Sequence, residues 1–365
     1  MRRSTKVRLA LGAIGIVTPL LFAECVLRFL PVYSGFKLAP LNAANPIPHF
    51  TPNQDITWSS GWNFRLVNKL RVNNYGFVND QDYVFTDESP LMCIIGDSYI
   101  EAAMLPYSDT LHGRLAKKAQ DRARVYSFGI SGAALSQYLI WAQYVCDEFK
   151  PDFLTFVIIG NDFDESLNKY KRRHAGWFYV EDDAGRLELE LFGFSPSSLR
   201  KLARKSALIR YLVWNCNLEA AVTRLFTRNR EFVGNVEARR EEADVKAVRR
   251  ATDQFLIDLR DMSDLPPEKV LFVVDGIRPE LYSATNSYQG KDPYVATIRR
   301  YFIEQATKHR YGVIDMNTKF RKHYAENGQR FEWSFDYHWN EIGHAVAGFT
   351  RPALNTPRNG IRSTV

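Results

Sequence analysis

Residues 93–102 read CIIGDSYIEA, where three apolar side chains run directly into Gly96, Asp97 and Ser98. The apolar run begins at Leu91, so that residues 91–96 form an unbroken LMCIIG segment. Continuous rather than alternating apolarity is typical of a strand in a parallel sheet that is covered on both faces. We therefore expect Ser98 at the carboxyl edge of a buried sheet, where the reactive groups of such folds gather.

Four further apolar runs follow the first one along the chain: VYSFG (125–129), FLTFVIIG (153–160), VLFVVD (270–275) and GVIDM (312–316). Apolar residues at helical spacing separate the second run from the third, and the fourth from the fifth. Strands that alternate with helices predict a parallel sheet joined by right-handed crossovers. The expected fold class is α/β, a flavodoxin-like three-layer sandwich with about five parallel strands and helices on both faces.

The N-terminal segment, residues 1–30, has the composition of a membrane anchor or a signal segment. Its apolar run extends from Leu9 to Ala23 and continues past Glu24, and it follows four basic residues: Arg2, Arg3, Lys6 and Arg8. About 20 apolar residues suffice to span a bilayer, and a positive flank keeps the N-terminus in the cytoplasm. We expect an uncleaved single-pass transmembrane helix; a signal peptide cut after Ala23 is the alternative. Either way, the body of the protein is expected outside the cytoplasm.

The composition of the 365-residue chain is that of a globular protein, with 45% hydrophobic and 24% charged residues. The net charge is +7, but basic residues are scattered, so no nucleic-acid partner is expected. The four cysteines form neither a CxxC pair nor a disulfide ladder, and free thiols are expected. A bridge between Cys146 and Cys216 is permitted by the compartment without being implied.

Three parts of the chain lie outside the alternating pattern. Residues 31–90 are expected to be an extracytoplasmic lead-in with a turn at 73–76, and residues 351–365 a C-terminal tail. Residues 165–240 are expected to be an insertion that contains a hairpin and then a basic amphipathic helix over 195–216. That helix is interpreted either as one packed on the core with an arginine-rich outer face, or as a lid or membrane-surface helix.

Polar side chains follow three of the predicted strands and meet at one edge of the sheet. Ser98 follows the first strand, Gly132 of the GISG segment follows the second, and Asn161 of the GND segment follows the third. Near the C-terminus, the segment SFDYHWNEIGH contains Asp336 and His338. His338 is the candidate base that activates Ser98, and Asp336 the group that orients the imidazole. The amide of Asn161 and the backbone amides of Ser98 and Gly132 are candidates for an oxyanion hole.

The blocks GDSYIE, the glycine of ISG, GND and the C-terminal Asp/His segment resemble those of the SGNH hydrolase superfamily, also called GDSL-like esterases. The resemblance covers about residues 91–348, within an expected catalytic domain over 91–350. It implies a triad of Ser98, His338 and Asp336, and an oxyanion hole of Ser98, Gly132 and Asn161. It implies no metal or organic cofactor.

The lead-in segment VNNYGF (72–77) and the anchor also resemble membrane-tethered bacterial members of that superfamily. This likeness implies an inner-membrane protein with its catalytic domain in the periplasm or outside the cell. There is one departure from the family pattern. The family usually has Asp three residues before His, where this chain has Phe335, and Asp336 lies two before. The Asp-x-His-Trp form resembles polysaccharide O-acetyltransferases of the superfamily.

The expected function is that of a membrane-anchored serine esterase that acts on an acylated small molecule or glycan. A polysaccharide O-acetyltransferase with the same triad is an alternative, because hydrolysis and transfer share an acyl-enzyme. A non-catalytic glycan-binding or assembly protein on a hydrolase fold is an alternative of another class. A metal-dependent phosphoesterase is disfavoured, because its Asp-x-His would have to come early in the chain.

Several polar residues near these blocks are interpreted as structural. Asp97 is expected to shape the turn before Ser98, and Glu101 to cap or pair locally. Ser131 lacks the spacing of a G-x-S-x-G elbow. His344 is expected to be structural, and two further histidines, His112 and His174, have no partners at metal-ligand spacing.

Overall fold

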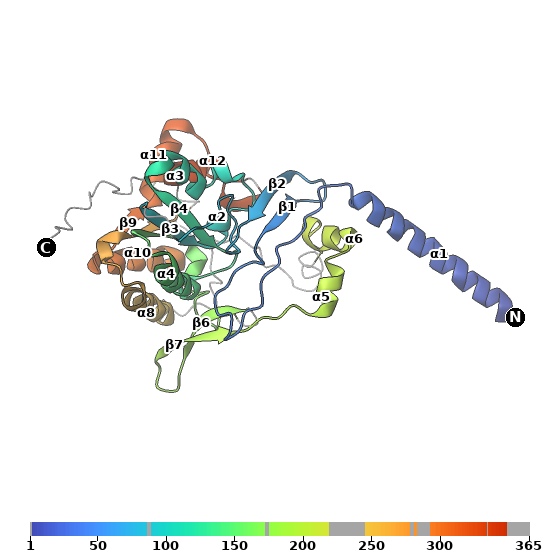
Figure 1. Cartoon of the computed structure of the whole chain (residues 1–365), viewed down its shortest axis with the longest axis horizontal. Helices are drawn as coiled ribbons and strands as arrows, with labels where there is room; N and C mark the ends of the chain where they lie inside the picture. Colours follow the sequence, from blue (N-terminus) through green and yellow to red (C-terminus); the bar gives the residue numbers. More distant parts are fainter. Residues whose placement is uncertain are drawn as a thin grey trace, which may run out of the picture.

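The computed structural model describes residues 2–85, 89–171, 175–218, 245–277, 281–282, 293–333 and 335–348. Its centre is a five-stranded sheet in the order β4-β3-β5-β8-β9, in which every neighbouring pair is parallel (Figure 1). The strands are β3 (Leu91–Gly96), β4 (Arg124–Gly129), β5 (Phe153–Ile158), β8 (Val270–Val274) and β9 (Gly312–Asp315). This order is flavodoxin-like, so the predicted fold class is confirmed. The direction of winding reverses around β3, the strand that precedes Ser98.

Helices cover both faces of the sheet and form a three-layer sandwich. Alternate residues of β3 separate the two cores, since Cys93 and Ile95 belong to one and Met92 and Ile94 to the other. The first core lies under α4 (Leu135–Phe149), α8 (Val245–Ser263) and α10 (Pro293–Lys308). The second lies under α3 (Leu111–Ala119), α11 (Met316–Asn327) and α12 (Glu341–Gly348).

Short elements complete the domain. The helix α2 (Ser98–Glu101) follows β3, and a small antiparallel pair, β10 (Glu332–Trp333) and β11 (Asp336–Trp339), precedes α12. Single 3₁₀ turns in the described part of the chain span Tyr107–Asp109, Gln120–Arg122, Gly160–Asp162 and Pro267–Lys269. The four cysteines of the chain are unbridged in the structure.

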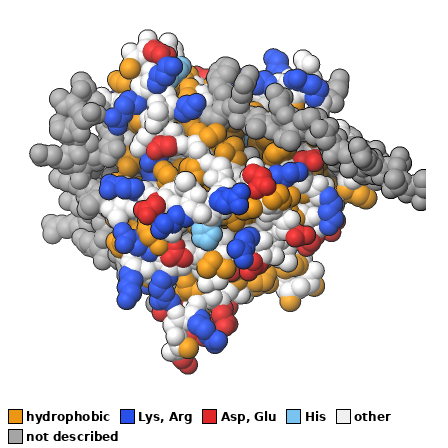
Figure 2. Space-filling view, turned by 90° about the vertical axis from the view of Figure 1, so that its left-hand side faces the viewer, with side chains coloured by type: hydrophobic (Ala, Val, Ile, Leu, Met, Phe, Trp, Pro, Cys, Tyr) orange, Lys and Arg blue, Asp and Glu red, His pale blue; other side chains and the backbone are white. Residues whose placement is uncertain are grey.

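The N-terminal helix α1 (Arg2–Leu27) extends away from the body of the protein (Figure 1). Its stretch Ala10–Leu27 is the one helical segment, within the described part of the chain, that is long and apolar enough to cross a membrane. On the face of the molecule turned away from α1, basic and acidic side chains are interspersed among apolar ones (Figure 2).

The lead-in contains a hairpin that the sequence pattern did not predict. Strands β1 (Gln54–Ser60) and β2 (Leu66–Val72) pair antiparallel, with Gln54 opposite Val72. Strand β1 has polar residues on both faces, and in β2 the polar Asn68 lies on the buried face, so the alternation of apolar and polar residues is interrupted in both strands. The predicted turn after β2 is present: the Asn73 side chain accepts the backbone amides of Tyr75 and Phe77 at 3.0 and 3.1 Å.

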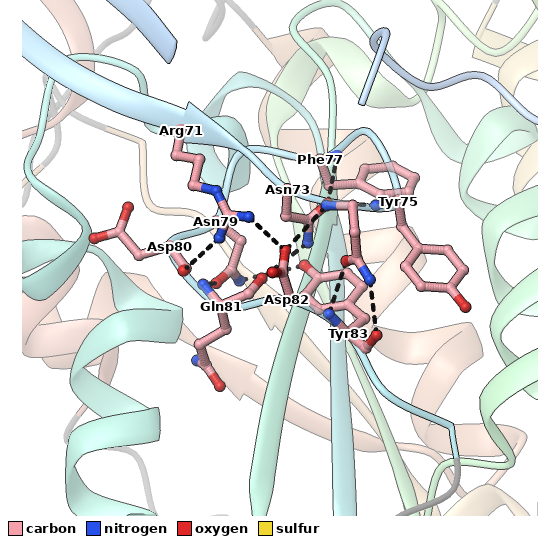
Figure 3. A network of polar contacts seen from close by, with 10 residues as sticks. Arg71, Asn73, Tyr75, Phe77, Asn79, Asp80, Gln81, Asp82 and Tyr83 are labelled. Carbon is pink, nitrogen blue, oxygen red and sulfur yellow. Dashed lines mark hydrogen bonds and ion pairs between the residues drawn. The ribbon is translucent and has the colours of Figure 1, made fainter. Parts of the chain in front are cut away.

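Hydrogen bonds and an ion pair among residues 71–83 form a network within the lead-in (Figure 3). Buried polar contacts attach this network to the edge strand β4. The Asn79 amide donates to Ser127 Oγ at 2.9 Å, and the Tyr83 hydroxyl donates to the Ser127 carbonyl at 2.5 Å. At the surface, Arg71 pairs with Asp82 at 2.7 Å. The lead-in is therefore a packed part of the structure rather than a loose tether.

The insertion differs from the expectation in its second half. The hairpin is present as β6 (Gly176–Glu181) and β7 (Leu187–Phe192). The single amphipathic helix predicted over 195–216 is wrong: it is divided into α5 (Ser198–Ala203), α6 (Ala207–Arg210) and a π-helical turn (Tyr211–Asn215). The division occurs because Ser206 caps a new helix, accepting the Ile209 amide at 3.1 Å. The rest of the predicted insertion, residues 219–240, and the predicted C-terminal tail, residues 351–365, lie outside the described residues.

Candidate active site

Ser98 is the first residue of α2 and lies directly beyond the end of β3. The Asp97 side chain caps this helix by accepting the Tyr99 amide at 2.9 Å, which agrees with its expected role in the turn. Gly129 at the end of β4 allows α2 to pack closely against that strand, because a Cβ at this position would lie 2.9 Å from the Glu101 backbone nitrogen. The strand end and a tight helix start therefore fix Ser98 at the carboxyl edge of the sheet.

The structure brings Ser98, His338 and Asp336 into one hydrogen-bonded chain. His338 Nε2 lies 2.7 Å from Ser98 Oγ, although 240 positions separate the two residues. His338 Nδ1 is hydrogen-bonded to Asp336 Oδ1, which also accepts the His338 backbone amide at 2.9 Å. With Nδ1–H held by the carboxylate, Nε2 is left to accept the Ser98 proton.

Tyr99 and Asp275, which the sequence analysis did not identify as site residues, hold the His338 segment in place. The Tyr99 ring packs on the imidazole with 5.0 Å between centroids, and its hydroxyl donates to the Tyr337 carbonyl at 2.7 Å. The buried Trp339 indole donates to Asp275 Oδ1 at 2.9 Å. Tyr99 follows the candidate nucleophile and Asp275 follows β8, so their positions at the sheet edge were the available signal.

The carboxyl group of Asp336 is kept ionised by its neighbours. Burial by itself raises the pKa of Asp336, yet hydrogen bonds from His338, together with the charges of His338 and Arg65, hold it below its ordinary value. Phe335, at the position where the family has Asp, lies against Arg65 instead, with the guanidinium carbon 3.7 Å from the ring centroid. The carboxylate therefore comes from Asp336 in this chain.

Gly132 and Asn161 line a pocket with Ser98, as the sequence predicts for neighbouring strand ends. The pocket has a volume of about 410 Å³, and part of its wall is apolar: Leu38, Leu41, Pro48 and Ile130. Gly132 has a φ of +81°, a conformation that favours glycine. Asn161 lies in the 3₁₀ turn after β5, which Asp162 fixes by accepting the Ile159 amide at 2.8 Å.

An ion pair that the sequence reasoning missed joins these two oxyanion-hole candidates. Asn161 Nδ2 donates to Glu165 Oε2 at 3.1 Å, and Glu165 pairs with Lys171. Lys171 Nζ in turn donates to the Gly132 carbonyl at 2.5 Å. One of the two Nδ2 hydrogens of Asn161 is used by Glu165, and the other is available to a ligand. In the sequence, Glu165 lies four residues after Asn161, and this spacing was the available indication that the two side chains are in contact.

The remaining polar neighbours have structural partners. Glu101 accepts the backbone amide and the hydroxyl of Ser131 at 2.7 and 2.8 Å, and burial raises its pKa to about 7. His344 Nδ1 accepts the Leu111 amide at 3.0 Å, as expected of a structural histidine. His112 is buried in α3, and His174 lies outside the described residues.

No family model and no curated protein matches the chain. Solved structures that are similar to it include TesA, at 12% identity and a TM-score of 0.38, covering 70% of this chain and 93% of that one. A lipolytic G-D-S-L family member from Veillonella parvula DSM 2008 is 10% identical with a TM-score of 0.37, covering 72% and 95%. The acetylxylan esterase Axe2 from Geobacillus stearothermophilus is 11% identical with a TM-score of 0.36, covering 73% and 93%.

Proposed function

We propose that the protein is a serine esterase that cleaves small acyl esters through an acyl-enzyme at Ser98. The observation that carries this proposal is the continuous contact from Ser98 Oγ through His338 to Asp336, beside a pocket that Asn161 and Gly132 also line. A serine hydroxyl is a poor nucleophile until a base within hydrogen-bond reach removes its proton. The 2.7 Å separation of His338 Nε2 and Ser98 Oγ meets that requirement.

In the first half-reaction, Ser98 Oγ attacks the ester carbonyl while its proton passes to His338 Nε2. The Asp336 carboxylate stabilises the resulting imidazolium, which then protonates the leaving alcohol as the C–O bond of the ester breaks. In the second half-reaction, His338 takes a proton from water and the hydroxide attacks the acyl carbon. The bond between that carbon and Ser98 Oγ then breaks, and His338 returns the proton to Ser98 Oγ. The carboxylic acid is released and the enzyme regains its starting state.

The negative charge of the tetrahedral intermediate requires donors near Ser98. The free hydrogen of Asn161 Nδ2 and the backbone amides of Ser98 and Gly132 are the groups that we assign to this role. Glu165 and Lys171 do not bind the oxyanion in this scheme, because they hold Asn161 and the Gly132 peptide in position. Preorganised donors of this kind each contribute about a hundred- to thousand-fold in rate.

An acylated glycan, with acetyl as the acyl group, is the substrate class that we favour. The pocket of about 410 Å³ is of a size that binds small ligands, and its wall combines apolar side chains with the polar groups around Ser98. The Asp336-x-His338-Trp339 form favours a second candidate, O-acetyl transfer to a glycan hydroxyl. Transfer would replace water by a sugar hydroxyl in the second half-reaction and leave every other step unchanged.

We further propose that α1 anchors the enzyme in the inner membrane as a single span. The basic residues before Leu9 would keep the N-terminus in the cytoplasm. The catalytic domain would then act in the periplasm or outside the cell. The length and apolarity of Ala10–Leu27 support the membrane span.

The test of the function is covalent labelling together with turnover. We expect a fluorophosphonate to modify the wild type at Ser98, and Ser98→Ala to lose both labelling and at least a thousandfold of its hydrolysis of a chromogenic acetate ester. Ser108→Ala, at an exposed serine in the 3₁₀ turn before α3, is the matched control and should keep both. Unchanged turnover in Ser98→Ala contradicts the mechanism.

The two candidate reactions separate when a hydroxylated glycan is added during turnover. Hydrolysis alone releases free acetate at the rate of ester cleavage, whereas transfer yields acetylated glycan at the expense of acetate. Mass spectrometry of the glycan and quantification of acetate distinguish them. A folded protein that neither reacts with the fluorophosphonate nor turns over any acetate ester favours the non-catalytic alternative.

A further inference from the structure

The last turn of α1 is tied to the insertion helix α6 by hydrogen bonds. The Glu24 carboxylate accepts the backbone amides of Ala207 and Leu208 at 3.1 and 2.8 Å, and the Ser206 hydroxyl at 2.8 Å. Arg28, the residue directly after α1, pairs with Glu24 at 2.8 Å. The end of the apolar helix and the start of α6 are therefore held at the same level of the molecule.

A small hydrophobic core lies next to these hydrogen bonds and adds apolar packing to the junction. Leu27 and Val32 are buried with Ala207 of α6, and Phe64 from the β1–β2 turn packs against them with Tyr211. The Tyr211 hydroxyl donates to the Trp62 carbonyl at 2.7 Å, so the β1–β2 turn belongs to the same unit. Figure 1 shows α5 and α6 on the side of the body from which α1 extends.

Large apolar side chains are exposed around this junction. Leu199 and Leu202 of α5 are 76% and 63% exposed, Phe29 after α1 is 90% exposed, and Trp62 is 72% exposed. Both leucines, together with Ile209, line a pocket of about 390 Å³ whose wall also includes Glu24 and Arg28. Single exposed apolar residues are ordinary, whereas a group of them around one junction marks an interaction surface.

Within their own segment, the exposed leucines have basic neighbours and no acidic ones. Residues 198–210 contain no acidic residue and five basic ones: Arg200, Lys201, Arg204, Lys205 and Arg210. Exposed leucines with lysine and arginine around them are typical of helices that lie in a membrane interface, and such basic groups attract anionic lipid headgroups. Aromatic side chains such as Phe29 and Trp62 also suit the headgroup region.

We infer that α5 and α6, with Phe29 and Trp62, form a membrane-contact surface that binds anionic phospholipids next to the α1 span. The inference rests on the proposed anchoring by α1. A bilayer is favoured over a protein partner because the candidate span ends at Leu27, one turn after Glu24, and Glu24 is bonded to α6. A bilayer crossed by this span has its headgroup layer at α6, and the contact fixes the orientation of the catalytic domain on the membrane.

The experiment uses the full chain in nanodiscs that contain phosphatidylglycerol with a diazirine on its acyl chain near the glycerol. After irradiation and digestion, mass spectrometry locates the lipid adducts. We expect adducts in residues 198–210 at a yield at least fivefold above that in α11, which lies elsewhere on the domain. We expect phosphatidylcholine nanodiscs with the matching probe to give at least threefold less labelling of residues 198–210.

A double variant and its matched control test the side chains. Leu199→Glu with Leu202→Glu should lower labelling of residues 198–210 at least fivefold while labelling of α1 persists. Ile257→Glu, at a 46% exposed aliphatic residue on α8, should leave both unchanged. These side chains are exposed, so the variants should fold. Ester hydrolysis by each variant, measured in parallel, checks that they do.

The outcomes separate the surface from the anchor and from the enzyme. Adducts in α1 with none in residues 198–210 overturn the membrane-contact surface and leave the anchor intact. The absence of adducts from α1 itself overturns the anchor on which the surface rests, whatever the esterase assay shows. Equal labelling in phosphatidylcholine and phosphatidylglycerol overturns the preference for anionic lipid.

Discussion

Asp336 reaches His338 from a position one residue closer than the family pattern places its carboxylate. Oδ1 of Asp336 accepts the His338 backbone amide as well as contacting Nδ1, so the residue both folds the turn and orients the ring. The Arg65 guanidinium lies over the Phe335 ring, and its positive charge favours the ionised form of Asp336. The local backbone turn, rather than the spacing in the sequence, therefore brings the carboxylate to the imidazole.

Replacing Asp336 by Asn should lower kcat for a chromogenic acetate ester by about a thousandfold, because the amide favours the wrong imidazole tautomer. Steady-state kinetics of the purified variant measure this effect. Asp261→Asn, at an exposed aspartate on α8, is the matched control and should keep wild-type kcat. A loss of less than threefold in Asp336→Asn would show that another group orients His338.

Lys171 and Glu165 contact the two oxyanion-hole candidates, so in the proposed mechanism they are positioning residues. Lys171→Met should lower kcat about tenfold to a hundredfold with a smaller change in KM, because a displaced donor weakens binding of the transition state more than of the ester. Glu165→Gln should lower kcat less than Lys171→Met does, because the side-chain amide oxygen of the glutamine can still accept a hydrogen bond from Asn161 Nδ2. Lys169→Met is the matched control. A change confined to KM would place Lys171 in substrate binding instead.

At the scale of elements, the turn after β2 depends on a glycine. Gly76 has a φ of +83°, and a Cβ there would lie 2.2 Å from the Phe50 carbonyl oxygen. Gly328 has a φ of +65° with nothing within 4 Å of an added Cβ. The two positions therefore share a left-handed backbone but differ in the space around it.

Gly76→Ala should lower the free energy of unfolding by about 3 kcal/mol, and Gly328→Ala by about 1 kcal/mol, because only the first adds a backbone clash to the strain of a positive φ. Denaturant unfolding of both variants in the same detergent measures the difference. Equal losses at the two positions would mean that the chain near Phe50 moves aside without cost.

Elements of the central sheet were predictable because their environment leaves a clear pattern. All five strands are covered on both faces, so they appear as apolar runs, and β3 begins and ends at the residues expected from the sequence. The hairpin β1–β2 was missed because its two strands carry polar residues on both faces. The division of α5 from α6 was missed because its cause includes Glu24, which lies more than 180 residues away.

At the scale of the whole molecule, buried carboxyl groups around the site make stability depend on pH. Burial raises the pKa of Glu101 to about 7 and that of Asp164 to about 7, and it also raises the pKa of Asp97 and Asp162. A group with a raised pKa binds its proton more tightly in the folded state than in the unfolded chain. The stability that these carboxyl groups contribute is therefore lost as the pH rises from about 4.5 to about 7.

Glu101→Gln should remove the part of this pH-dependent loss of stability that ionisation of Glu101 causes. The glutamine side chain stays neutral at every pH and can still form a hydrogen bond with Ser131. The difference in unfolding free energy between pH 5 and pH 8 should shrink by up to about 3 kcal/mol relative to the wild type. Denaturant unfolding in detergent at both values measures it. Glu148→Gln, at an exposed residue of α4, provides the control. An unchanged pH dependence would show that Glu101 ionises as freely as in the unfolded chain.

The sequence alone determined the α/β class, the five sheet strands, the apolar N-terminal helix and the positions of Ser98, Gly132, Asn161 and His338 at strand ends and near the C-terminus. These features follow from local patterns of burial, which residue order records. Only the tertiary structure decided that Asp336 reaches His338, that Glu165 and Lys171 join Asn161 to Gly132, and that Glu24 holds α6. The Asp336 contact depends on the exact path of a local backbone turn, whereas the contacts of Lys171 with Gly132 and of Glu24 with α6 depend on how distant segments fold against one another.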